Sequence, residues 1–405
     1  MNRCASIALV ALTSAACGQE RTRVPAPRAE IRDSAGIRIV ENPRPPEGSR
    51  LAWRIGPEPL VSIGVLEGEE AYMLYGALDA TRLSDGRIVV ANRGTNELRV
   101  FDASGTHLEN WAGEGEGPGE FTSLSRVEPW PGDSIAAWWT RTGGISVFDS
   151  DGNYGRTFRL GGNDEDPIWL ALRPESATRA GSVLATWRWR DADTIVVHLR
   201  DGEGDLKARL GTHPGPEYHL TPPGAYRFDL WEQIFGRRLV HVPWGDLVVI
   251  GRTDRYQLRA FRADGSLARI VRRQHVPRPP ERSDIEAQIE EQVSLVPLEW
   301  SPEEIERYQA DVRRGYRAAP VAEHLPALDS VMADALDHLW VREFESPADD
   351  RPGVPWTVFD PEGRVLGFVE TPEDLKIYEI GSDYLLGHSG NELEVESVQL
   401  WPLER

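Results

Sequence analysis

The chain has 405 residues, a formal net charge of −20 and 40% hydrophobic residues, among them 14 Trp. This composition excludes an intrinsically disordered chain, because it can bury a large core. The acidic excess argues against nucleic acid as a partner, since affinity for that polyanion comes largely from Lys and Arg. The 38 Gly and 30 Pro recur between short apolar runs, a pattern typical of turn-rich all-β proteins.

The N-terminus carries the pattern of an export signal. Arg3 precedes an apolar stretch, Ala5 to Ala16, that is too short to span a bilayer as a permanent helix. Ser14-Ala15-Ala16-Cys17 resembles the lipobox of bacterial lipoproteins, with Ser14 where Leu is usual. The alternative is an ordinary secretory peptide that is cut nearby.

The lipobox resemblance implies three features of the mature protein. Residues 1–16 would be removed as a signal peptide, Cys17 would be lipidated, and the protein would face the periplasm or the cell exterior from a membrane. Residues 17–50 are rich in Arg, Pro and Glu, which predicts a flexible tether, although Ile37 to Val40 has the composition of a strand.

Residues 51–405 contain a repeat. An apolar β run introduced by a Gly or Asp turn begins at six places: Asp85, Asp133, Gly181, Asp246, Asp337 and Asp383. Three of the five steps between them are 46 to 48 residues long, and a second apolar run that ends in a Gly-containing turn follows most of them. A period near 47 residues with four short strands predicts the blades of a β-propeller.

The sixth unit lacks an outer strand, because the chain ends soon after the apolar run Val395 to Trp401. Leu60 to Gly64 aligns with His107 to Ala112, which is the predicted outer strand of the first unit. We therefore expect this N-terminal segment to pair into the last blade and close the ring, which removes its open edges.

The glycine-rich segment Gly113 to Phe121, framed by Leu83 to Asn92 and Leu98 to Gly105, resembles the NHL repeat of six-bladed propellers. The chain is similar in this respect to bacterial six-bladed propeller lipoproteins, many of which have no assigned function. The resemblance implies an all-β six-bladed β-propeller. A phosphate cradle is not expected here, because neither a Lys-Ser/Thr pair nor a helix start follows. Instead we expect Phe121 to pack between two blades.

The longest step of the repeat predicts a helical insertion at 281–320, between blades 4 and 5. Ser283 to Glu286 and Ser301 to Glu304 both have the pattern of a capping box, and apolar residues follow each at helical spacing. Two readings stay open for the insertion. It caps the central channel as a lid, or it packs on the rim of a blade.

Candidate site residues are scattered, because the sequence contains no HExxH, H-x-H or G-x-S-x-G motif and no Cys cluster. Some six-bladed propellers are calcium-dependent lactonases or lyases, and that resemblance implies Asp79, Asn92 and Asp329 as ligands. The alternative is that they are hydrogen-bonded strand or turn residues. Aromatic residues beside Arg126 or Arg238 at the channel mouth would suit a carbohydrate or peptide.

These observations predict a lipid-anchored propeller at the cell envelope that acts as a binding or scaffolding module. Its ligand would be a protein, peptide or carbohydrate, no cofactor is expected, and the site would lie at the face that carries the helical insertion. The alternative is a metal-dependent hydrolase, lactonase or lyase of the calcium type, with its site in the central channel.

Overall fold

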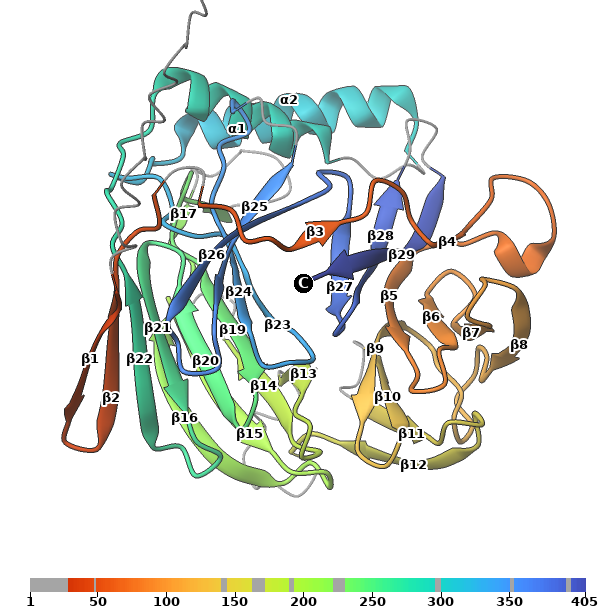
Figure 1. Cartoon of the computed structure of the whole chain (residues 1–405). Helices are drawn as coiled ribbons and strands as arrows, with labels where there is room; N and C mark the ends of the chain where they lie inside the picture. The colour runs from red at the N-terminus through yellow and green to blue at the C-terminus, as the bar shows by residue number, and fades with distance from the viewer. Residues whose placement is uncertain are drawn as a thin grey trace, which may run out of the picture.

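The computed structural model describes residues 28–46, 49–139, 144–161, 172–188, 193–220, 230–295, 300–349, 353–390 and 395–405. Six sheets, in which the strands of each blade pair antiparallel, surround a central axis, so the chain is an all-β six-bladed propeller (Figure 1). In each sheet the chain passes from the innermost strand outward. The six sequence runs that revealed the repeat form the second strand of each blade.

The first three blades have four strands each. Blade 1 contains β5 (Ala77–Arg82), β6 (Ile88–Asn92), β7 (Glu97–Phe101) and β8 (His107–Trp111). Blade 2 contains β9 (Leu124–Trp130), β10 (Ser134–Trp139), β11 (Gly144–Phe148) and β12 (Tyr154–Arg159). Blade 3 contains β13 (Arg173–Ala177), β14 (Val183–Trp187), β15 (Thr194–Arg200) and β16 (Leu206–Pro214).

Blades 4 and 6 carry additional strands, whereas blade 5 has four. Blade 4 contains β19 (Leu239–Trp244), β20 (Leu247–Arg252), β21 (Arg255–Phe261) and β22 (Leu267–Arg273). Blade 5 contains β23 (Val331–Ala333), β24 (Leu339–Arg342), β25 (Val354–Phe359) and β26 (Val365–Thr371). Blade 6 contains β27 (Lys376–Ile380), β28 (Tyr384–Gly390) and β29 (Glu396–Glu404). A separate pair, β17 (Tyr218–Leu220) and β18 (Leu230–Glu232), lies between blades 3 and 4 in the sequence.

An N-terminal strand closes the ring, as the sequence predicts. Strand β4 (Val61–Ile63) pairs antiparallel with β29, with Ile63 opposite Val398, and supplies the outer strand that blade 6 lacks. Strand β3 (Arg54–Ile55) pairs with the end of β29, and a short 3₁₀ helix (Glu70–Tyr72) leads into blade 1. Ile63 is 1% exposed, so this closure also buries apolar surface.

A hairpin occupies part of the segment that was expected to be a tether. Strand β1 (Glu30–Ser34) pairs with β2 (Ile37–Asn42), and β2 pairs in parallel with β22, which extends blade 4 to six strands. Val40 is fully buried, and the Asn42 side chain donates to the carbonyls of Arg272 and Gly363. The predicted signal peptide, residues 1–16, and Cys17 lie outside the described residues. Most of the remaining tether lies outside them too, apart from short stretches next to the hairpin.

Asp residues shape the turns between third and fourth strands. In blade 1, Asp102 Oδ1 accepts hydrogen bonds from the backbone N–H groups of Ser104 and Thr106, and Gly105 has φ +85°. The same pattern recurs at Asp149, Asp201 and Asp360. In a tight turn some backbone N–H groups have no backbone carbonyl to donate to, and the Asp carboxylate accepts from them instead. The Gly three residues later adopts the positive φ of the turn, which explains the Asp-x-x-Gly spacing.

Large apolar side chains fill the wedges between blades. Phe121 is fully buried among residues of blades 1 and 2, as the sequence predicts, and Trp138 packs between blades 2 and 3. Each sheet thus buries both faces against its neighbours, which is why no blade is expected to be stable without them.

Two helices, α1 (Arg282–Ser294) and α2 (Pro302–Ala318), form the predicted insertion between blades 4 and 5. Figure 1 shows them above the blades at the top of the view. Ser301 and Glu304 cap α2 reciprocally, as predicted. The capping box of α1 is different from the predicted one. Glu281 and Asp284 form it instead of Ser283 and Glu286, because the helix begins two residues earlier.

The helices pack on connecting segments. Ile289 and Val312 contact a buried apolar cluster that includes Trp231 and Phe235 before blade 4, and Phe344 of blade 5 packs against it. This contact favours the reading in which the insertion packs on the rim. Neither helix in the described part of the chain combines the length and the apolar character that a membrane span needs.

Candidate functional site

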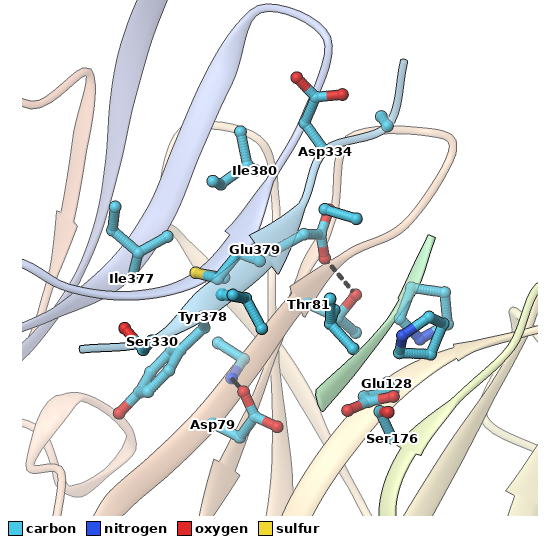
Figure 2. A pocket seen from close by; sticks show the side chains of 18 of the residues that line it. Asp79, Thr81, Glu128, Ser176, Ser330, Asp334, Ile377, Tyr378, Glu379 and Ile380 are labelled. Atoms are coloured by element: carbon cyan, nitrogen blue, oxygen red, sulfur yellow. Dashed lines mark hydrogen bonds between the residues drawn. The ribbon is translucent and has the colours of Figure 1, made fainter. Parts of the chain in front are cut away.

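A cavity of about 950 Å³ occupies the centre of the ring (Figure 2). Its walls come from the innermost strands of all six blades, β5, β9, β13, β19, β23 and β27, and from the turns that follow several of them. Blade 5 also contributes residues of its other strands, Arg342, Val354, Trp356 and Thr371. None of the described residues that line it belongs to α1 or α2. The cavity therefore lies in the channel rather than beneath the helical insertion.

Three carboxylates bridge neighbouring innermost strands. Asp79 of β5 accepts from the backbone N–H of Val127 on β9 at 3.3 Å, and Glu128 of β9 accepts from Ala177 N on β13 at 2.6 Å. Glu379 of β27 accepts from the Thr81 hydroxyl on β5 at 2.6 Å (Figure 2). Each carboxylate satisfies a polar group of the next blade, so the acidic wall also holds the ring together.

One guanidinium is shared among the acidic groups at the centre. Arg126 Nε lies 3.4 Å from Asp79 Oδ2, and Arg126 Nη1 lies 3.4 Å from Glu128 Oε1 and donates to the backbone carbonyl of Glu175. The Glu175 carboxylate accepts from the Thr186 hydroxyl. Three carboxylates, those of Asp79, Glu128 and Glu175, therefore face a single nearby arginine.

This imbalance and burial change the protonation of the cluster. Burial raises the pKa of Asp79 to about 8, against the opposing charge of Arg126. Burial likewise raises the pKa of Glu128 to about 7, with 21% of its side chain still exposed in the channel. Burial also raises the pKa of Glu379. At neutral pH the cavity thus holds carboxyl groups that can donate a hydrogen bond as well as accept one.

Other parts of the lining are apolar and aromatic. Trp130, Trp356 and Tyr378 line the cavity beside Met332, and burial lowers the pKa of His241, which favours its neutral form. Ser176 places a buried hydroxyl oxygen there that has no hydrogen-bond partner among the described residues. A ligand could supply that partner.

The structure brings together two of the five predicted ligand-binding residues. Asp79 and Arg126 meet in the channel wall. Asn92 is fully buried, accepts from Tyr75 N and donates to Thr95, so it holds a turn. Arg238 pairs with Glu232 away from the cavity lining, and Asp329 lies 3.7 Å from Arg342.

Sequence reasoning missed Glu128, Glu175 and Glu379. Each lies on an innermost strand, a few residues before the turn that introduces a second strand. A polar residue that alternates with apolar ones just upstream of the Gly/Asp turn is the signal that could have identified them.

The described residues contain no group of three His, Cys, Asp or Glu side chains that could hold a metal ion. The channel carboxylates are instead engaged by backbone N–H groups, hydroxyls and Arg126. As arranged, these side chains do not fit the calcium site that the alternative reading implies.

Comparison with protein-family models supports the fold. A family model described as a 6-bladed beta-propeller matches residues 66–128. Comparison with curated protein sequences found no match. Solved structures that resemble the chain include a Bacteroides fragilis protein provisionally described as exported, with a TM-score of 0.48, 10% identity, and coverage of 90% of this chain and 99% of that one.

Two further structures show more distant likeness. A Bacteroides vulgatus member of the DUF4221 family has a TM-score of 0.45 and 9% identity, with 87% of this chain and 99% of that one covered. An inactive virginiamycin B lyase from Staphylococcus aureus, solved with quinupristin, has a TM-score of 0.38 and 12% identity, with 82% and 83% covered.

Proposed function

We propose that this propeller is a binding module and that its central channel holds a small polar ligand. The observation that carries the proposal is the cavity of about 950 Å³, which all six blades line with convergent polar groups and a few aromatic side chains. Concave sites of this size, with apolar walls and a small number of placed polar groups, are typical of small-molecule sites.

The charge of the lining indicates the class of ligand. Eight carboxylates line the cavity, Asp79, Glu128, Glu175, Asp334, Asp337, Glu373, Asp374 and Glu379, against four cationic side chains, Arg126, Arg179, Arg342 and Lys376. Acceptors therefore exceed fixed donors, and an anion would meet repulsion. A neutral or cationic molecule that is rich in hydroxyl, amide or amine groups fits this wall, as a carbohydrate or peptide would.

Three polyols that share a six-carbon chain but differ in charge test this proposal at pH 8: the amine meglumine, neutral sorbitol and anionic gluconate. At equal ionic strength we expect meglumine to raise the melting temperature most, sorbitol less and gluconate least. A ligand stabilises the folded state by mass action, about 1.4 kcal/mol at ten times its Kd. Ser176→Trp, which places a large side chain in the channel, should reduce the shifts.

Charge variants separate channel binding from effects elsewhere. Glu175→Gln should weaken meglumine more than sorbitol, since it removes one channel carboxylate, whereas Glu203→Gln on the outer surface should change neither. Unchanged shifts in Ser176→Trp, a preference for gluconate, or no shift with any of the three polyols would contradict a channel that binds neutral or cationic ligands.

We further propose that the chain is exported and held to a membrane through a lipid on Cys17, so that the propeller works at the cell envelope. The lipobox-like residues Ser14 to Cys17 support this. Cys17→Ser should move most of the protein from the membrane fraction to the soluble fraction, as measured by fractionation and immunoblotting. Cys4→Ser is the matched control and should stay with the membrane. Retention of the Cys17→Ser protein there would contradict lipid anchoring.

A further inference from the structure

A second, smaller cavity of about 250 Å³ lies between blades 3 and 4 and shares no lining residue with the channel. His213 on β16 forms one side of it. Arg252, Arg255, Gln257 and Arg259, from the hairpin of β20 and β21, form the other. A pocket with three arginines is unexpected on a chain whose net charge is −20.

The arginines of this crevice are only partly neutralised. Arg252 makes a two-point ion pair with Asp254, with Nη2 2.7 Å from Oδ2 and Nε 2.9 Å from Oδ1. Arg255 lies 3.6 Å from the same carboxylate, and Arg259 has no ion-pair partner among the described residues. Three guanidinium groups therefore share one carboxylate, which leaves two positive charges in excess.

Neutral donors complete the lining. Gln257 accepts from Arg272 through Oε1, so its amide N–H₂ is left to donate. His213 lies at hydrogen-bonding distance from the Leu210 carbonyl, with Nε2 3.0 Å away. Burial lowers the pKa of His213, and the neighbouring Arg259 and His241 lower it further, while the Leu210 carbonyl opposes this. An anion in the crevice would offset the repulsion between Arg259 and a protonated His213.

We propose that this crevice binds a small dianion of the phosphate type, at a site that is independent of the channel. Guanidinium groups present paired N–H donors that match phosphate oxygens. The excess of two positive charges matches a dianion, whereas a monocarboxylate would leave one charge unpaired. The volume suits a phosphate group with a short substituent better than a large molecule.

The test uses inorganic phosphate with the full-length protein. At pH 7.5 and equal ionic strength, phosphate should raise the melting temperature, while acetate and chloride should have little effect. Arg255→Gln and Arg259→Gln should each weaken phosphate binding on the order of tenfold, because each removes a charge-assisted donor. Arg282→Gln, which removes an exposed arginine on α1, is the matched control and should leave binding unchanged.

A local readout guards against variants that only alter stability. In NMR titrations, phosphate should raise the pKa of His213 in the wild-type protein, and about tenfold more phosphate should be needed to do so in Arg259→Gln. His388, which does not line the crevice, should not respond. Equal effects of acetate and phosphate would overturn the assignment to a dianion. Equal phosphate binding by the wild type and both arginine variants, or an unchanged His213 titration, would overturn the site itself.

Discussion

Raising the pH from 7 to 9 is expected to lower the free energy of unfolding by about 2 kcal/mol, because the folded protein keeps protons that the unfolded chain has lost. In the folded state the pKa is about 8 for Asp79 and about 7 for Glu128, compared with 3.8 and 4.5 in their ordinary state. The unfolded chain has released both protons by pH 7. The stability that these groups contribute is therefore present at low pH and disappears as the pH rises through 7 and 8.

The window above pH 7 isolates this effect from the histidines. Burial lowers the pKa of four histidines, His213, His241, His275 and His388. Because their pKa is lowered by folding, these histidines make the protein more stable as the pH rises toward 6.5, and their contribution changes little above that pH. Below pH 7 the histidine contribution therefore rises while the carboxyl contribution falls. Above pH 7 the carboxyls dominate.

Asp79→Asn should flatten this pH dependence. An amide cannot ionise, so between pH 7 and pH 9 the free energy of unfolding should fall by about 1.4 kcal/mol less in the variant than in the wild type. The loss of one acceptor oxygen costs the same at every pH and does not change this difference. Asp102→Asn is the control, because hydrogen bonds lower the pKa of that exposed carboxyl and it stays ionised throughout the window. Urea unfolding at several pH values measures both slopes. A wild-type stability that is constant or rises from pH 7 to 9 would refute the protonated cluster.

The repeat was visible in the sequence because the second strand of each blade is buried on both faces and follows a turn. Those runs are almost continuously apolar, as in Ile88 to Ala91, so they stand out from the chain. The closing strand could be predicted too, since the last unit visibly lacked one. The strand at Ile37 to Val40 was predicted, but its hairpin with β1 and its pairing with β22 were not. Its partner β22 lies about 230 residues away, as the Asn42–Arg272 bond shows, and β1 is exposed along its whole length.

The site was harder to predict than the fold. Asp79 and Arg126 were identified, but their contact depends on how blades 1 and 2 face each other, which no local pattern records. The ligand site was predicted at the face that carries the helical insertion, because the insertion interrupts the repeat. Its apolar residues face Trp231 and Phe235, however, so its sequence pattern reports packing rather than ligand binding. An interrupted repeat marks where the chain was extended and does not by itself mark where it binds.

Glu343→Gln is expected to destabilise the protein by about 3–5 kcal/mol, because it leaves a buried guanidinium without its counter-charge. Arg273 at the end of β22 is 4% exposed and pairs with Glu343 after β24 through two bonds, of 2.9 and 2.7 Å. The hydroxyls of Thr357 and Tyr256 also donate to Glu343, at 2.7 and 2.9 Å. This network joins blade 4 to blade 5 beside the helical insertion, so its loss should loosen that junction first.

A double variant distinguishes a coupled pair from two independent contacts. Arg273→Met with Glu343→Leu removes both charges, and it should be less destabilised than either single variant, because neither charge is then buried without a partner. The exposed pair of Arg282 and Glu286 on α1 is the matched control, and Glu286→Gln should have little effect on stability. Urea unfolding measures the loss of stability in Arg273→Met, Glu343→Leu, the double variant and Glu286→Gln. If the double variant lost the sum of the two single losses, the ion pair would not be what couples blades 4 and 5, and the apolar cluster that includes Leu258 and Phe359 would have to hold that junction instead.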